Sequence, residues 1–359
     1  MIQKETYSLE NIKRIKDKYN VDPELAQRSI FALGLVETLS LVGTDFIFKG
    51  GSSLMLLNET PKRLSTDVDI LVEPGYDIET YINKASRIFP FLSSEESIRN
   101  TNKTISKKHF RIKYASPRTE REVTIIVDVL FANNRYKKIE QRPIKSNLLI
   151  CSGDDVIVKT PSVEEMLADK LTAFAPHTIG INFFNENFSN DKRLEVIKQF
   201  YDVSNLFDIS HDFELVKETY HKAAQEEISF RDIDVTYQDC LMDSFNSALT
   251  MLSWGKFHIE DFRNYVEGIK KIESHLIGER FNLNNAYLPA AKIMLLSACI
   301  LEDVDPFALD IKQKGLIENP PYNKINRLIK IHPEAFNIAA TAIEMMETDD
   351  KPTLRESKV

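Results

Sequence analysis

Two aspartates separated by one residue, Asp67 and Asp69, lie in the segment STDVDILVE at the start of an apolar run. Residues i and i+2 of a β-strand point to the same face, so the two carboxylates would lie on one face about 7 Å apart. Like charges this close repel each other and are costly to remove from water. A hard cation such as Mg²⁺, which prefers oxygen ligands, removes that cost. The pair predicts a metal site; the alternative is an exposed edge strand with hydrated aspartates.

A turn of small residues precedes the aspartate pair in FKGGSSLMLL and consists of Gly50, Gly51, Ser52 and Ser53. Glycine lets a backbone approach a ligand closely. The first amides of a following helix attract anions, and the serine hydroxyls add donors. Such a turn is a weak signal alone. Combined with the aspartate pair, it predicts a cradle for the β- and γ-phosphates of a nucleotide.

A third carboxylate, Asp128, lies between Val127 and Val129 in TIIVDVLF, which reads as an interior strand. A carboxylate there is costly unless it is hydrogen-bonded or binds a metal. A strand next to the first pair would bring Asp128 beside Asp67 and Asp69. Three carboxylates could hold two Mg²⁺ ions, one activating an acceptor hydroxyl and one neutralising the departing pyrophosphate. The alternative is a hydrogen-bonded core aspartate.

Two further polar residues lie in predicted helices. The segment SVEEMLADKLTAFA begins with the capping-box pattern of Ser162 and Glu165 and carries Lys170. Lys170 could reach a triphosphate as a point charge. Asp202 could orient Lys170 or act as a base. The alternatives are a hydrated helix lysine and a helix-surface aspartate.

The periodicity predicts two domains of different class. Short apolar runs alternate with helical stretches up to about residue 160, which favours an α/β or α+β unit on a mixed sheet. Strands are expected at 45–48, 68–73, 109–116, 121–132, 147–153 and 155–162, and helices at 76–89, 162–175, 190–208, 212–228, 237–254, 258–277, 284–302 and 333–347. We expect a domain over residues 1–208 and an all-α helical bundle over residues 209–359, because NLFDISHD interrupts the helical pattern.

Composition narrows the class of protein. The chain has 359 residues, 43% hydrophobic and 28% charged, as is typical of globular domains. It contains no apolar run near the ~18 residues that cross a bilayer and no signal-peptide pattern at its start. The three cysteines are far apart and show neither disulfide nor zinc spacing. A cytoplasmic protein with no membrane partner is expected.

Charge is distributed unevenly along the chain. The net charge is −8, yet the segment 99–145 has thirteen Lys and Arg residues against four Asp and Glu, a local charge of +9. A local basic surface can bind a polyanion even when the whole chain is acidic. The segment therefore favours a nucleic-acid acceptor, and the alternative is a hydrated hairpin face.

The glycine turn, the Asp-x-Asp strand and the later strand aspartate together resemble the DNA polymerase β-like nucleotidyltransferase superfamily. The finer pattern, FKGGSSLMLL followed by RLSTDVDI, resembles the AbiEii/AbiGii toxin family, with Arg63 and Ser65 in the Arg-x-Ser-x-Asp-x-Asp run. Lys170 matches that family's Asp-Lys-Leu helix, and Asp202 its Tyr-Asp-x-x-x-Leu setting. The resemblance covers residues 44–208. Serine replaces the family's usual threonine in the turn, and His177 stands where an arginine is usual.

The resemblance implies an NTP-dependent nucleotidyltransferase that acts as the toxin of a toxin–antitoxin or phage-defence pair. It implies transfer of a nucleotide to RNA, in particular to tRNA, and a cognate antitoxin protein as partner. It also implies that Gly50, Gly51, Ser52, Ser53, Arg63, Ser65 and Lys170 bind the nucleotide.

Two other readings stay open on sequence alone. The same fold could transfer a nucleotide to a small molecule or a protein side chain. It could also be a degenerate, non-catalytic module that binds a partner protein. Retention of the three acids and Lys170 argues against the second reading, and the basic segment argues against a small acceptor.

Overall fold

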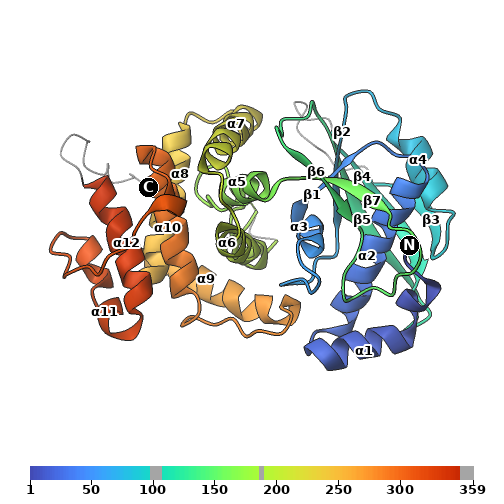
Figure 1. Ribbon diagram of the computed structural model, residues 1–359, viewed down its shortest axis with the longest axis horizontal. Helices are drawn as coiled ribbons and strands as arrows, with labels where there is room; N and C mark the ends of the chain where they lie inside the picture. The colour runs from blue at the N-terminus through green and yellow to red at the C-terminus, as the bar shows by residue number, and fades with distance from the viewer. Residues whose placement is uncertain (98–106, 186–189, 348–359) are drawn as a thin grey trace. The chain divides into compact units, whose positions relative to one another are not determined.

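The computed structural model describes residues 1–97, 107–185 and 190–347 (Figure 1). The chain forms two compact units. The first comprises Met1–Ser162 together with Glu273–Arg280, and the second comprises Val163–Ile272 and Phe281–Val359. The division at residue 162 differs from the boundary expected at 208. The reason is packing, because the helices that follow Ser162 pack on one another and on the next helix, α7 (Phe213–Arg231).

The first unit contains a mixed sheet of seven strands in the order β3-β4-β5-β2-β1-β7-β6. Its strands are β1 (Ile47–Lys49), β2 (Val68–Val72), β3 (Phe91–Glu96), β4 (Lys107–Ala115), β5 (Glu122–Phe131), β6 (Ile139–Pro143) and β7 (Ile157–Pro161). β2 pairs parallel with β5 and β1 pairs parallel with β7, whereas the other neighbours are antiparallel. The expected mixed sheet is confirmed.

One face of this sheet carries the core of the unit. Helices α1 (Leu9–Tyr19), α2 (Pro23–Leu41) and α4 (Ile78–Ala85) belong to this unit, and α2 contacts β2, β5 and β7 (Figure 1). Val68 and Ile70 of β2 and Val127 of β5 are fully buried in this core. Because side chains alternate along a strand, the residues between them face the opposite side. That opposite face carries Asp69 and Asp128.

The strand expected at 147–153 is wrong. Leu148 and Leu149 are buried in the core, but their backbone forms a turn, and only Cys151 makes an isolated bridge, to Ile2. The apolar side chains pack into the core, but the backbone makes no ladder of hydrogen bonds with a neighbouring strand. The sequence pattern alone cannot distinguish such a buried loop from a buried strand.

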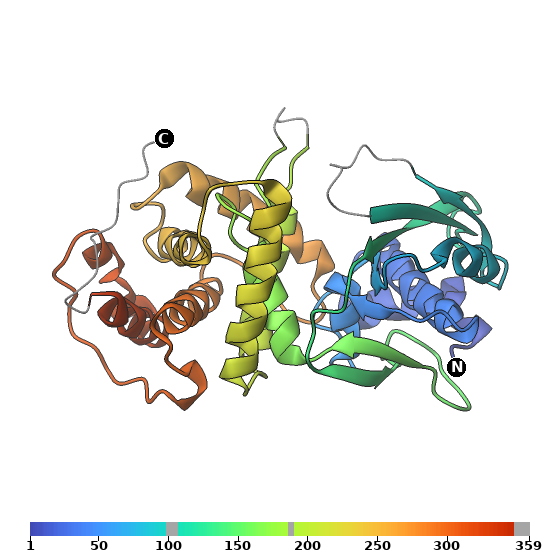
Figure 2. The ribbon, with the colours of Figure 1, turned by 90° about the horizontal axis from the view of Figure 1, so that it is seen from above.

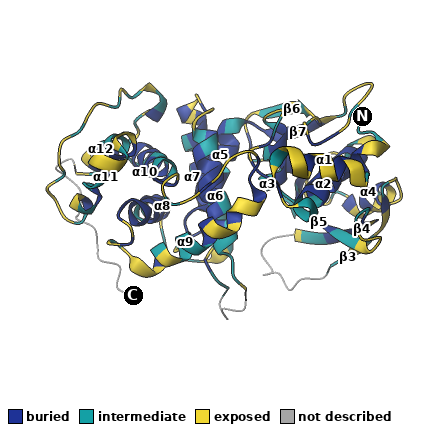
Figure 3. Cartoon of the chain, turned by 90° about the horizontal axis from the view of Figure 1, so that it is seen from below, coloured by how far each residue is buried: buried dark blue, intermediate teal, exposed yellow. Residues whose placement is uncertain are grey.

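The second unit is helical. Its helices are α5 (Val163–Ala173), α6 (Arg193–Phe207), α7 (Phe213–Arg231), α8 (Tyr237–Leu252), α9 (Ile259–Ile272), α10 (Tyr287–Glu302), α11 (Leu328–Ile331) and α12 (Pro333–Met346) (Figure 2). α10 is apolar on all sides and packs against α6, α8 and α12, so it is largely buried (Figure 3). This confirms the expected C-terminal helical region. Within the described residues, no helix is both long enough and apolar enough to cross a membrane.

The helix expected at 258–277 ends at Ile272, followed by a short 3-10 turn at Glu273–His275. Residues 275–277 then pair with the backbone of 62–64. Leu64 N donates to His275 O at 2.7 Å, and Ile277 N donates to Lys62 O at 3.0 Å. Residues 273–280, here called the return segment, therefore belong to the first unit although the helices of the second unit precede and follow them.

Candidate active site

Gly50 begins the short helix α3 (Gly50–Ser53) directly after β1 and has φ +72°. This left-handed conformation favours glycine. A β-carbon at Gly50 would overlap the carboxylate of Asp69. The turn therefore lies directly against the strand aspartate, and only a residue without a side chain fits between them.

Gly51 lies close to Arg63 and Ser65, two residues of the predicted Arg-x-Ser-x-Asp-x-Asp motif. A β-carbon there would come within 2.8 Å of the Ser65 hydroxyl and 2.9 Å of an Arg63 guanidinium nitrogen. Arg63 is only 5% exposed. The structure thus brings Gly50, Gly51, Arg63, Ser65 and Asp69 together around one turn.

The two serines of the turn are fully buried, and their hydroxyls bond to the backbone. Ser52 Oγ donates to the carbonyl oxygen of Asp67, and Ser53 Oγ donates to the carbonyl of Gly50 at 2.8 Å. The hydroxyls hold the turn and tie it to the segment that enters β2. Their contact with phosphate stays a prediction.

Asp69 and Asp128 are direct partners in the parallel pairing of β2 with β5. Partners in a ladder project to the same face, on strands about 4.8 Å apart. Lys49 is the antiparallel partner of Asp69 on β1, and His109 is the partner of Asp128 on β4. A row of polar residues therefore crosses the sheet in the order Lys49, Asp69, Asp128, His109.

Asp67 is exposed and comes one residue before β2, so it precedes Asp69 on the same stretch of chain. Within the described residues, no group of three or more His, Cys, Asp or Glu side chains meets the geometry of a closed metal site. Mg²⁺ is commonly held by one or two carboxylates together with substrate phosphates and water. The facing pair of Asp69 and Asp128 fits that protein share of the ligands.

His109 was not expected at the site. Its Nδ1 lies 2.5 Å from Asp128 Oδ1, and its side chain is only 11% exposed. A hydrogen bond of this kind fixes a carboxylate's orientation and leaves its second oxygen available. The hairpin register could have revealed it, because the strands expected at 109–116 and 121–132 place His109 opposite Asp128 once paired.

Arg63 is held by the return segment. Arg63 makes a β-bridge with Leu276, and the neighbouring residue Leu64 bonds to His275 O. The guanidinium also donates to its neighbour's carbonyl, with Arg63 Nη1 3.2 Å from Leu64 O. Backbone pairing to a distant part of the chain thus fixes the loop that presents Arg63.

Lys170 and Asp202 are brought together within the second unit. Lys170 Nζ on α5 lies 3.0 Å from Asp202 Oδ2 on α6 and 3.0 Å from Gln199 Oε1. The side chain of Lys170 is 10% exposed and that of Asp202 is 3% exposed, so neither is a hydrated surface group. The pairing that the sequence suggested for Asp202 and Lys170 is present, while contact of Lys170 with a nucleotide stays a prediction.

His177 is engaged with acids of its own unit. The Nε2 atom of His177 lies 2.7 Å from Asp261 Oδ2, and the same oxygen lies 3.0 Å from His258 Nδ1. The backbone amide of His177 donates to Asp243 Oδ2 at 2.8 Å. The hydrogen bond that His177 donates to Asp261 is the main reason why the pKa of His177 is raised. Burial raises the pKa of Asp243. These contacts connect the loop after α5 to α8 and α9.

The basic segment 99–145 is less positive than its sequence implies, because acids, most of them outside the segment, pair with several of its described cations. Lys108 bonds to Glu79, Lys113 lies 3.4 Å from Glu95, and Arg118 lies 2.6 Å from Glu24. Arg142 bonds to Glu140, and Lys145 to Asp155 at 2.7 Å. Arg99 and Lys103 lie outside the described residues. The segment supports nucleic-acid binding less strongly than the local charge suggested.

A glycine turn packed against facing strand aspartates, on a mixed sheet followed by helices, is the arrangement expected of a nucleotidyltransferase. Residues 35–281 match the model of the family described as "Nucleotidyl transferase AbiEii toxin, Type IV TA system". The chain belongs to this family, and the resemblance noted in the sequence is confirmed. It is thus a nucleotidyltransferase of a class with a nucleotide substrate and an antitoxin partner. A search of curated proteins found no match.

Two solved structures from Helicobacter pylori are similar to this chain. JHP933 is 12% identical, with 77% of this chain and 94% of JHP933 covered, at a TM-score of 0.44. A second chain, with a provisional description as a nucleotidyltransferase, is 12% identical, with 78% and 94% covered, at a TM-score of 0.43.

Proposed function

We propose that this toxin transfers the nucleoside monophosphate of an NTP to a hydroxyl of RNA, with tRNA as the preferred acceptor, in a Mg²⁺-dependent reaction. The observation that carries this proposal is the contact of the glycine turn with Asp69, which is itself the ladder partner of Asp128. A phosphate-sized turn and two metal-binding carboxylates on one sheet face are the parts that nucleotidyl transfer requires.

The residues of the first unit have separable roles in this proposal. Asp67, Asp69 and Asp128 would hold Mg²⁺, and His109 would keep the carboxylate of Asp128 oriented. Bound Mg²⁺ would supply charge neutralisation on the phosphates and activation of the acceptor hydroxyl. The backbone at Gly50 and Gly51 and the guanidinium of Arg63 would receive the triphosphate, since Arg binds phosphate with a planar set of donors.

For Lys170 and Asp202 the proposal follows the family resemblance. Lys170 would bind the nucleotide, and Asp202 would orient its ammonium through the 3.0 Å ion pair. The cognate antitoxin would be a protein partner, and phage defence would be the setting of the pair.

The test is transfer of label from an α-labelled NTP to purified tRNA with and without Mg²⁺. We expect labelling by the wild type, and loss of labelling by Asp69→Asn, which keeps the side-chain shape but removes its charge. The matched control is Asp17→Asn on α1, an exposed aspartate away from the sheet face. Labelling that persists in Asp69→Asn would refute the assigned metal site. Labelling of protein or a small molecule, with none of RNA, would refute the acceptor.

A further inference from the structure

A cavity in the second unit lies apart from every residue assigned above. Its volume is about 440 Å³, within the size range of small-ligand sites. Its walls come from the loop after α5 (Gly180, Ile181, Asn182), from Lys192 at the start of α6 and from Arg231 at the end of α7. Three separate elements therefore build it.

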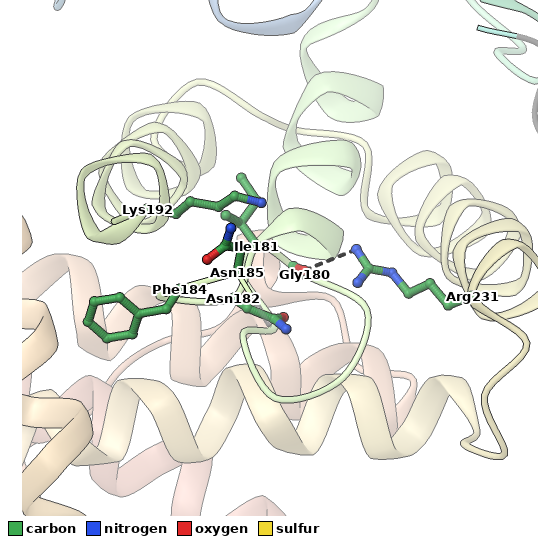
Figure 4. A pocket seen from close by; sticks show the side chains of 7 residues that line it. All are labelled: Gly180, Ile181, Asn182, Phe184, Asn185, Lys192 and Arg231. Atoms are coloured by element: carbon green, nitrogen blue, oxygen red, sulfur yellow. Dashed lines mark hydrogen bonds between the residues drawn. The ribbon is translucent and has the colours of Figure 1, made fainter. Parts of the chain in front are cut away.

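Two cations face each other across this cavity. Figure 4 shows the side chains of Lys192 and Arg231 extending towards each other from opposite sides of the loop. None of the described residues that line the cavity is acidic. The chain as a whole carries a net charge of −8, so this positive lining is a local departure from the average surface.

The two cations differ in how they are held. Arg231 Nη2 donates to Gly180 O at 3.0 Å, and its Nε lies 3.6 Å from Glu227, a partly exposed i,i+4 pair of little energetic weight. A guanidinium has five donors, so one bond to Gly180 leaves others for a ligand. In the described part of the chain, the ammonium of Lys192 has no side-chain partner.

A fixed guanidinium opposite a lysine ammonium is suited to phosphate, which Arg binds through its planar fork and Lys binds as a point charge. We propose that this cavity is a second phosphate-binding site of the toxin. Resting on the proposed function, it would hold either a backbone phosphate of the nucleic-acid acceptor or a phosphate of a free nucleotide. The exposed carboxamide of Asn182 lies at its edge and can bond to an attached sugar or base.

The test measures binding without Mg²⁺, so it does not depend on the transfer reaction. A labelled short single-stranded RNA and a labelled AMP are titrated with the wild type, with Lys192→Glu and with Lys222→Glu. Lys222 is an exposed lysine on α7 outside the cavity, so the control makes the same charge change. Thermal unfolding of each variant confirms that it is folded.

We expect Lys192→Glu to weaken RNA binding by roughly tenfold. The slope of the logarithm of the binding constant against the logarithm of the salt concentration should become shallower by about 0.7, the value for one phosphate contact on a single strand. Lys222→Glu should leave both unchanged. Loss of AMP binding alone would also support the site and assign it to the free nucleotide. Equal losses in the two variants, unchanged binding in Lys192→Glu, or no binding of either probe by the wild type would overturn the proposal. If Asp69→Asn still labelled tRNA in the transfer assay, that result would count against the proposed function but not against this second phosphate site.

Discussion

Gly50 combines a positive φ with direct contact to a predicted metal ligand, and the two effects can be separated. Gly50→Ala should cost about 1–2 kcal/mol from the left-handed backbone and should also displace the Asp69 carboxylate, abolishing transfer. Gly75 has φ +82° and open space where a β-carbon would lie, so Gly75→Ala should show the stability loss alone. Thermal unfolding and label transfer measure the two effects. Equal activity of both variants would contradict the assigned contact.

His109 offers a second test at the scale of single residues. His109→Phe removes the donor to Asp128, and we expect the Mg²⁺ concentration needed for NTP-induced thermal stabilisation to rise about 10- to 100-fold, the usual cost of losing a partner of a metal ligand. His109→Asn, whose amide nitrogen can occupy the place of Nδ1, should recover part of the loss. A structural role alone would give no difference in Mg²⁺ dependence between the two variants.

Among single residues, the proximity of the carboxylates to one another and to the glycine turn could be predicted from sequence. A carboxylate inside an apolar strand is improbable unless it has a partner or a function. His109 and Lys49 were not recognised, because their role arises only from the register with Asp128 and Asp69. The backbone partners of the serine hydroxyls, Asp67 O and Gly50 O, could not be read from sequence either.

At the scale of elements, α5 and α6 are joined by the buried pair of Lys170 and Asp202. Asp202→Ala would leave a buried, unpaired ammonium and should destabilise the protein by about 3–5 kcal/mol. Replacing both residues, Lys170→Met with Asp202→Leu, should recover much of that stability. Thermal unfolding of Lys170→Met, of Asp202→Leu and of the double variant gives the coupling energy.

If Lys170 also binds the nucleotide, the double variant should be stable yet inactive in label transfer. Full activity of a stable double variant would show that the pair is structural only.

The loop after α5 is attached to α9 through His177 and Asp261, and this contact depends on pH. Because the pKa of His177 is raised above 6.5 in the folded state, its protonation stabilises the fold. That contribution is fully present below the ordinary pKa and is lost as pH rises through the folded-state value. Unfolding temperatures between about pH 6 and pH 8, where histidine titrates, should therefore fall less steeply for His177→Gln than for the wild type. Parallel curves for the two proteins would contradict this role.

The positions of helices and strands were largely predictable from periodicity, as β2, β5, α8 and α12 show. The elements β3, β6, α1 and α2 were not expected. Two of the elements that were expected differ for a common reason. Residues 147–153 and 273–277 carry apolar side chains that fit a strand or a helix, but their backbones bond to distant parts of the chain. No local pattern records such partners.

At the scale of the whole molecule, the return segment makes the first unit discontinuous in sequence. The amides of Leu64 and Ile277 should exchange with solvent as part of one cooperative opening, because each is hydrogen-bonded within the same pairing. Their protection should differ from that of α12 amides in the second unit. Hydrogen exchange of the full chain checks this, and exchange of Ile277 together with α12 would contradict the assignment of the segment to the first unit.

The two compact units divide at residue 162, whereas the sequence led us to expect a domain boundary at residue 208. The sequence resemblance spans both units, so it gave no sign that the sheet ends at residue 162 or that a later segment returns to it.

The bridge between Arg63 and Leu276 has a consequence for biosynthesis. A ribosome that has completed the whole sheet, through Ser162, has not yet made the residues that secure Arg63. The pairing forms only after translation has passed residue 277, so a truncated or stalled nascent toxin lacks the support of its own arginine loop. For a protein that harms its producer, this order of synthesis delays the complete site until most of the chain exists.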